Sequence, residues 1–181
     1  TTRKVSIRSD LVPITPDLPE HPAVLAEVLR WRKIAFDAFR AQGFQPDASV
    51  AVVKESLDGR EEVIRSQSTV LTRLIAASLL HAVPGARVAL FNAGSIRVDD
   101  VLPPGPLTQY DVLRIMPFGG EVVSVTMSGA LLRRVLDQGV RNAGAGGYLH
   151  VAGVEGPAGG WRIAGSEPLN DALAYPVALN D

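Results

Sequence analysis

The stretch Phe91-Asn92-Ala93-Gly94-Ser95-Ile96-Arg97 follows a short apolar run and combines an amide, small residues and an arginine. The Asn92 amide can both donate and accept hydrogen bonds, and the Arg97 guanidinium offers a rigid fork of donors to phosphate or sugar oxygens. One interpretation is a strand that ends in a turn beside a solvated charge. The other is a strand end where small residues leave room for a ligand that Asn92 and Arg97 hold.

Three further side chains could contact such a ligand. Phe118, in Pro117-Phe118-Gly119, is either a core aromatic beside a proline turn or a ring on which a base stacks, and such stacking contributes about 1–3 kcal/mol per base. Arg60 and Arg65 follow an Asp-Gly turn, and Arg65 precedes an expected helix whose amino terminus suits anions. The alternative for both arginines is an exposed surface position.

Other chemistries find little support in the residues. The chain has no cysteine, which excludes disulfides and thiolate metal sites. Its three histidines are far apart, and we expect His150 to be structural or exposed. Residues 143–147 are glycine-rich but lack the Lys-Ser/Thr pair of a phosphate-binding loop, which favours a flexible turn. The net charge of -1 gives no reason to expect nucleic acid or an anionic membrane as partner. No apolar run reaches the about 18 residues of a membrane span.

Helix and strand signals mix along the chain without a regular βαβ repeat. Apolar spacing and capping residues predict helices over residues 22–42, 68–81, 109–115 and 129–139. Alternating or short apolar runs predict strands over residues 49–54, 87–91, 121–127, 148–151, 161–164 and 175–179. Residues 57–60 are typical of a turn, and residues 98–107 of a rigid proline-rich loop. This mixture predicts an α/β (α+β) fold in which two mixed β-sheets are flanked by helices.

Length and composition set the scale of this fold. With 181 residues, 46% apolar and 20% charged, the chain suits one domain with an ample core and a connecting segment. We expect residues 1–45 to form an extended N-terminal segment and a connecting helix, and residues 46–181 to form the folded domain. Both ends look like cuts inside a longer chain, because the start lacks an initiator Met and the end follows an apolar strand-like run.

Three segments, taken in order, resemble one family. NAGSIR, then GPLTQYDVLRIMPFGGEVVSVTMSGALLRRVLD, then GGYLHVAGV are similar to the C-terminal domain of the 5'-nucleotidase and UDP-sugar hydrolase family. The family pattern runs N-G-G-G-I-R, G-x-(I/L)-T-x-x-D-(V/L), P-F, (T/S)-G-x-x-(L/I)-x-x-x-L and G-(G/F)-(F/Y)-L-x-x-S-G. The resemblance extends from about Leu57 to the end, and the helix over residues 22–42 is similar to the connection from the family's catalytic domain.

The resemblance implies a division of labour. In such enzymes an N-terminal metallophosphatase domain holds two divalent metal ions that clamp the attacking and leaving oxygens, and the C-terminal domain binds the nucleoside part of the substrate. This chain lacks D-x-H and G-N-H-(D/E) segments, so we expect it to hold no cofactor and to be inactive alone. The implied partners are a nucleotide or nucleoside-like small molecule and the parent's N-terminal domain, in the periplasm or outside a bacterial cell.

The substrate-binding residues that the resemblance implies are Asn92, Arg97, Phe118, Arg65 and Arg60. The chain also departs from the family: Ala93 and Ser95 replace two glycines, the helix over residues 68–81 lacks several polar residues, and F-L-x-x-G-G-D-G-(F/Y) would lie beyond the last residue. Two alternatives therefore stay open. One is a non-catalytic ligand-binding or interaction module on the same fold, and the other is a family relative with a non-nucleotide substrate such as a sulfur-carrier conjugate.

Overall fold

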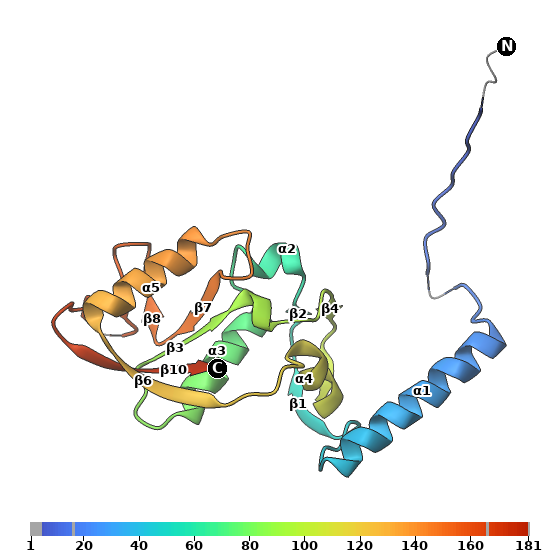
Figure 1. The fold of residues 1–181 in the computed structure, drawn as a ribbon, viewed down its shortest axis with the longest axis horizontal. Helices are drawn as coiled ribbons and strands as arrows, with labels where there is room; N and C mark the ends of the chain where they lie inside the picture. The colour runs from blue at the N-terminus through green and yellow to red at the C-terminus, as the bar shows by residue number, and fades with distance from the viewer. Residues whose placement is uncertain (1–4, 16, 166, 181) are drawn as a thin grey trace. The chain divides into compact units, whose positions relative to one another are not determined.

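The computed structural model describes residues 5–15, 17–165 and 167–180, and the chain divides into two compact units, residues 1–44 and 45–181 (Figure 1). The first unit contains helix α1 (Pro22–Ala41), as the apolar spacing predicts. Pro22 occupies the first turn, where its missing N–H is tolerated, and Gly43 follows the end with a positive φ of 91°. None of the residues of α1 is buried.

The centre of the second unit is a four-stranded mixed sheet. Its strand order is β6 (Val122–Ser128), β10 (Ala174–Asn180), β3 (Val88–Asn92) and β7 (Leu149–Ala152). Strand β10 runs parallel to β3 and antiparallel to β6, and β3 runs antiparallel to β7. Because β3 and β10 are parallel, their last residues, Asn92 and Asn180, lie at the same edge of the sheet.

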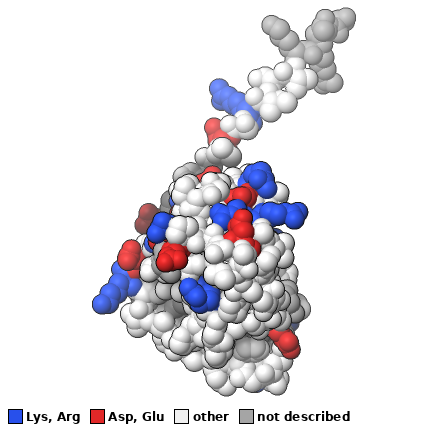
Figure 2. Space-filling view, turned by 90° about the vertical axis from the view of Figure 1, so that its left-hand side faces the viewer, with Lys and Arg blue, Asp and Glu red and all other residues white. Residues whose placement is uncertain are grey.

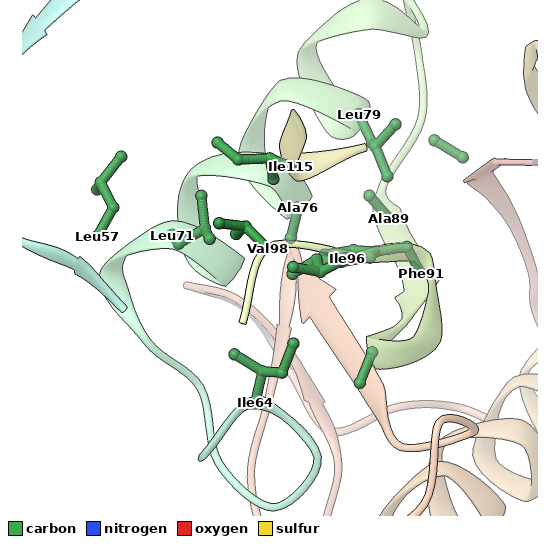
Figure 3. Packing of buried hydrophobic residues seen from close by; sticks show 12 residues of the cluster. Leu57, Ile64, Leu71, Ala76, Leu79, Ala89, Phe91, Ile96, Val98 and Ile115 are labelled. Atoms are coloured by element: carbon green, nitrogen blue, oxygen red, sulfur yellow. The ribbon is translucent and has the colours of Figure 1, made fainter. Parts of the chain in front are cut away.

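Helices α3 (Val70–Ala82) and α5 (Gly129–Arg141) cover opposite faces of this sheet. Successive side chains of a strand point to opposite faces, and β3 follows this rule. Ala89 and Phe91 pack in the cluster on the α3 side, and Val88 and Leu90 pack in the cluster on the α5 side. Figure 3 shows the α3-side cluster, to which segments before and after β3 also contribute: Leu57, Ile64, Leu71, Ala76, Leu79, Ala89, Phe91, Ile96, Val98 and Ile115.

The remaining described strands form three antiparallel pairs: β1 (Ser49–Val53) with β5 (Gly105–Thr108), β2 (Leu57–Asp58) with β4 (Val101–Leu102), and β8 (Val154–Glu155) with β9 (Arg162–Ile163). The mixed α/β class is thereby confirmed. The turn predicted over residues 57–60 is wrong for its first half, and strands interrupt the predicted loop over residues 98–107. Both segments gain their strand structure from partners more than 40 residues away, which a local pattern does not reveal.

Local capping sets where three helices begin. Thr69 and Thr72 form a capping box at the start of α3, and Thr108 and Asp111 form another at the start of α4 (Gln109–Ile115). The Ser128 hydroxyl accepts a hydrogen bond of 3.2 Å from the Leu131 N–H at the start of α5. These boundaries confirm the predicted ones to within two residues. The structure adds two short elements, α2 (Glu61–Ile64) and a 3₁₀ turn, η1 (Ala93–Ser95).

Candidate functional site

A pocket of about 270 Å³ opens at the sheet edge where β10 ends, close to η1. We name it the strand-end pocket, and its lining residues are Leu79, Ser95, Met116, Phe118, Gly119, Gly120, Glu121, Val122 and Asn180. The carboxyl ends of parallel strands are a frequent place for ligands in α/β folds. The lining combines an apolar wall with a few polar groups, which is the usual composition of a small-molecule site.

Phe118 lines this pocket, and Arg97, which does not line it, contacts the Phe118 ring from a position 21 residues earlier in the chain. The Arg97 Cζ lies 4.9 Å from the centroid of the Phe118 ring, in cation–π geometry. Phe118 is 60% exposed, so it is not a core aromatic. The Arg97 backbone N–H donates to the Ile115 carbonyl oxygen at 2.8 Å, which ties the segment after η1 to the end of α4. A flat ligand can therefore stack on the ring face that the guanidinium leaves open.

Asn92 lies beside the pocket but does not line it. Its Nδ2 donates to the Gly146 carbonyl oxygen at 3.1 Å, and its Oδ1 accepts from the Ser95 hydroxyl at 2.7 Å. Ser95 does line the pocket, and its hydroxyl also accepts from Asn180 Nδ2 at 3.2 Å. The structure thus connects Asn92 to the pocket through Ser95, and the Asn92 amide holds the turn together.

The small residues of this turn have a packing role. The Gly94 N–H donates to the Gly146 carbonyl oxygen at 2.8 Å, and the Ala93 N–H donates to the Tyr148 carbonyl oxygen at 2.8 Å. A Cβ on Gly94 would lie 3.0 Å from Asn92 Nδ2 and 3.2 Å from the Gly146 oxygen. The glycine-rich turn at residues 142–147 therefore fills the space that Gly94 leaves, and it packs against η1.

Arg60 and Arg65 face a different pocket, of about 600 Å³, which shares no lining residue with the strand-end pocket. The Arg60 guanidinium donates two hydrogen bonds to the Asp58 carboxylate, from Nε to Oδ1 at 3.0 Å and from Nη2 to Oδ2 at 2.7 Å. Hydrogen bonds from Arg60 lower the pKa of Asp58 below its ordinary value. Arg65 pairs with Glu61 at 3.0 Å between Nη1 and Oε1. Each arginine therefore has a carboxylate partner already.

The surroundings of these arginines are more acidic than the sequence suggests. Arg65 follows the end of α2 and lies five residues before the start of α3. Asp99 Oδ1 accepts the Glu61 N–H at 2.8 Å and so occupies the amino end of α2. Three carboxylates line this pocket beside the two arginines. On the face shown in Figure 2, acidic and basic side chains are likewise interspersed.

His150 is a structural residue, as expected, and it lies in the core. It is 1% exposed, and neither ring nitrogen has a hydrogen-bond partner. Its ring centroid lies 5.1 Å from that of Phe91 and 5.4 Å from that of Tyr148. Burial lowers the pKa of His150 to about 4. The Ile64 backbone has a smaller effect that raises this pKa, although it lies outside hydrogen-bonding geometry.

The described residues contain no group of three His, Cys, Asp or Glu side chains placed to hold a metal ion. Within residues 5–15, 17–165 and 167–180, no helix has the length and hydropathy needed to cross a bilayer.

The fold and the pocket define an α/β domain whose candidate site lies at the carboxyl ends of two parallel strands. The sequence profile described as "5'-nucleotidase, C-terminal domain" matches residues 49–181, and the chain belongs to this family. Protein UshA of Salmonella pullorum is 30% identical over 181 residues, which is 94% of this chain and 30% of that protein. The trifunctional nucleotide phosphoesterase protein YfkN of Bacillus subtilis is 29% identical over 150 residues, which is 80% of this chain and 10% of that protein.

Solved structures agree with this membership. A 5'-nucleotidase precursor from Thermus thermophilus superimposes with a TM-score of 0.68 at 27% identity, over 87% of this chain and 32% of that one. The sulfate thiohydrolase SoxB, also from Thermus thermophilus, shares the fold, with a TM-score of 0.59 at 16% identity over 86% of this chain and 30% of that one. The chain spans no more than about a third of the length of any of these relatives.

Proposed function

We propose that this chain is the substrate-binding domain of a bacterial 5'-nucleotidase-like metallophosphoesterase, and that the strand-end pocket receives the nucleoside part of a nucleotide or nucleotide sugar. The observation that carries the proposal is the exposed Phe118 ring that lines the pocket and carries the Arg97 guanidinium over it. An exposed ring and an arginine fork, side by side, match a ligand that combines a flat base with sugar and phosphate oxygens. The family membership and the names of the relatives support the same class of ligand.

The five candidate residues divide between the two ends of this ligand. Phe118 stacks on the base, Arg97 contacts sugar or phosphate oxygens, and Asn92 supports them through the turn. Arg60 and Arg65 are proposed contacts for the phosphate end. Because Asp58 and Glu61 already neutralise these two arginines, each would have to exchange a carboxylate for a phosphate, and we expect them to contribute less than Arg97.

The reaction belongs to the parent protein in this proposal. Two divalent metal ions, bound by an N-terminal metallophosphatase domain outside this chain, would activate water for hydrolysis of the phosphate ester. We propose a periplasmic or extracellular location, which the description of one solved relative as a precursor supports. Incubating the chain with AMP and Mn²⁺ should give no sustained phosphate release; turnover at a rate proportional to the chain concentration would contradict this division of labour.

A binding experiment tests the nucleoside site. The chain is titrated with adenosine, AMP and UDP-glucose by NMR, beside the variants Phe118→Ala and Val112→Ala, the second a partly exposed α4 position outside the pocket. Losing about 1–3 kcal/mol of stacking should weaken adenosine binding about 5- to 150-fold in F118A. V112A should bind as the wild type does. Absence of binding by the wild type, or equal binding by F118A, would overturn the proposal.

One observation favours the alternative of a non-nucleotide substrate on the same fold. Asn92, Arg60 and Arg65 all have partners within the chain, so fewer polar groups are free for a nucleotide than the family pattern implies. Comparing AMP with ribose 5-phosphate discriminates the two functions. If removal of the base leaves the affinity unchanged, the base site is not used and the non-nucleotide function is favoured.

A further inference from the structure

We infer that Asn180 is the residue that reads the hydrogen-bonding edge of the base in the strand-end pocket, and that Ser95 and Asn92 set the orientation of its amide. This inference rests on the proposed function of the pocket. Asn180 ends β10, lies half-buried, and lines the pocket together with Ser95 and Phe118. Asn92, by contrast, does not line it.

A directed chain of hydrogen bonds fixes the Asn180 amide. Asn180 Nδ2 donates to Ser95 Oγ at 3.2 Å, Ser95 Oγ donates to Asn92 Oδ1 at 2.7 Å, and Asn92 Nδ2 donates to the Gly146 oxygen at 3.1 Å. Every donor points the same way, from the pocket toward the glycine-rich turn. Successive bonds of this kind polarise one another and strengthen the chain.

The Gly146 carbonyl decides the direction of the whole chain. A carbonyl oxygen only accepts, so the Asn92 side chain must present its NH₂ group to Gly146 and its oxygen to Ser95. The Ser95 hydroxyl has a single proton and must donate it to that oxygen. Ser95 can then only accept from Asn180, which must present its NH₂ group. The amide orientation of Asn180 thus follows from a backbone atom 34 positions away in sequence.

This orientation leaves Asn180 with one N–H and its Oδ1 for a ligand. Among the residues that the structure describes, no hydrogen bond uses these two groups. A donor beside an acceptor complements the adenine edge, which offers N6–H as donor and N7 as acceptor, the pair that asparagine recognises in nucleic acids. Guanine offers two acceptors, O6 and N7, at the corresponding edge. The fixed amide therefore predicts a preference for adenosine over guanosine, which share the same ribose.

Asn180 and Ser95, the first two members of this chain of bonds, belong to regular structure, so the amide is held firmly. Asn180 pairs with Val122 in the ladder between β10 and β6, and Ser95 closes η1, which two backbone bonds tie to residues 146–148. Site residues on such elements are positioned more accurately than residues on free loops. Replacing Ser95 by Ala keeps the Cβ but removes the hydroxyl, so Asn180 and Asn92 lose their connection.

The test measures dissociation constants for adenosine and guanosine with the full chain. The wild type should prefer adenosine by about tenfold or more, and N180A should lose this preference and bind adenosine about tenfold more weakly. N180D, which only accepts, should lose adenosine binding to at least the same extent, and S95A should lose several-fold. Q67A removes an exposed amide outside the pocket and should behave as the wild type.

A second readout protects the test against misfolded variants. In the wild type, the side-chain ¹⁵N–¹H signals of Asn180 should shift on adding adenosine more than those of Asn92. If the wild type binds adenosine but N180A keeps the affinity and the preference, the assignment of Asn180 is overturned and the nucleoside site stands. If the wild type binds neither nucleoside, the proposed function fails and the assignment fails with it.

Discussion

Protonation of His150 should destabilise this domain at mildly acidic pH. The imidazole is 1% exposed between Phe91 and Tyr148, and neither ring nitrogen forms a hydrogen bond. Burial lowers its pKa from 6.5 to about 4. The unfolded chain therefore binds a proton below pH 6.5, whereas the folded chain does so only near pH 4. Folding stability that is fully present above pH 6.5 is lost as the pH falls from 6.5 to 4.

The size of this loss follows from the difference between the two pKa values. A difference of one unit between the folded and unfolded pKa values corresponds to about 1.36 kcal/mol of stability. Lowering the pKa of His150 from 6.5 to about 4 therefore costs about 3 kcal/mol of stability once the pH is below 4. At pH 5 the linkage relation gives a loss of about 2 kcal/mol. A typical domain of this size has only about 5–15 kcal/mol of stability, so urea unfolding resolves such a change.

The assay compares urea unfolding of the wild type and His150→Phe at pH 7.5 and pH 5. Phenylalanine keeps an aromatic ring beside Phe91 but does not titrate, so H150F should lose about 2 kcal/mol less than the wild type over this interval. H81Q, at an exposed histidine of α3, is the matched control and should retain the wild-type pH dependence. Parallel losses in the wild type and H150F would show that the buried imidazole is not the source of the pH dependence.

Two further predictions concern stability. Thr69→Ala removes the cap of α3, the bond to the Thr72 N–H at 3.3 Å, and the Thr69 Oγ1 bond to the Asp58 oxygen at 2.7 Å. In urea unfolding, T69A should lose about 1–2 kcal/mol of the free energy of unfolding, whereas T69S, which keeps the hydroxyl, should lose much less. Equal losses in the two variants would contradict the capping role. Gly129→Ala would place a Cβ 2.7 Å from the Asn170 carbonyl carbon, so we expect a cost of about 1–3 kcal/mol. Gly119→Ala meets nothing within 4 Å and should leave the melting temperature nearly unchanged; similar shifts in both variants would refute this explanation.

Part of the candidate site was predictable from the sequence. The resemblance singled out Arg97 and Phe118, and the structure brings these two side chains within cation–π distance. The pairing of Arg65 was also visible in principle, because Glu61 lies four positions before it, the spacing at which opposite charges meet on a helix. Asn180 escaped notice. Asn180 is a polar residue at the end of an apolar strand, as Asn92 is at the end of β3. This pattern indicates a shared site only once the two strands are known to be parallel.

The sequence by itself determined the elements whose free energy depends on neighbours within about four positions. The capped starts of α3, α4 and α5 and the length of α1 are of this kind, because caps, proline and helical apolar spacing act locally. Only the tertiary structure decided the content of the pocket. The alignment of β10 with β3 brings Asn180 to Ser95, 85 positions apart, and the glycine-rich turn orients Asn92. Such contacts depend on strand register and chain packing, which no local pattern encodes.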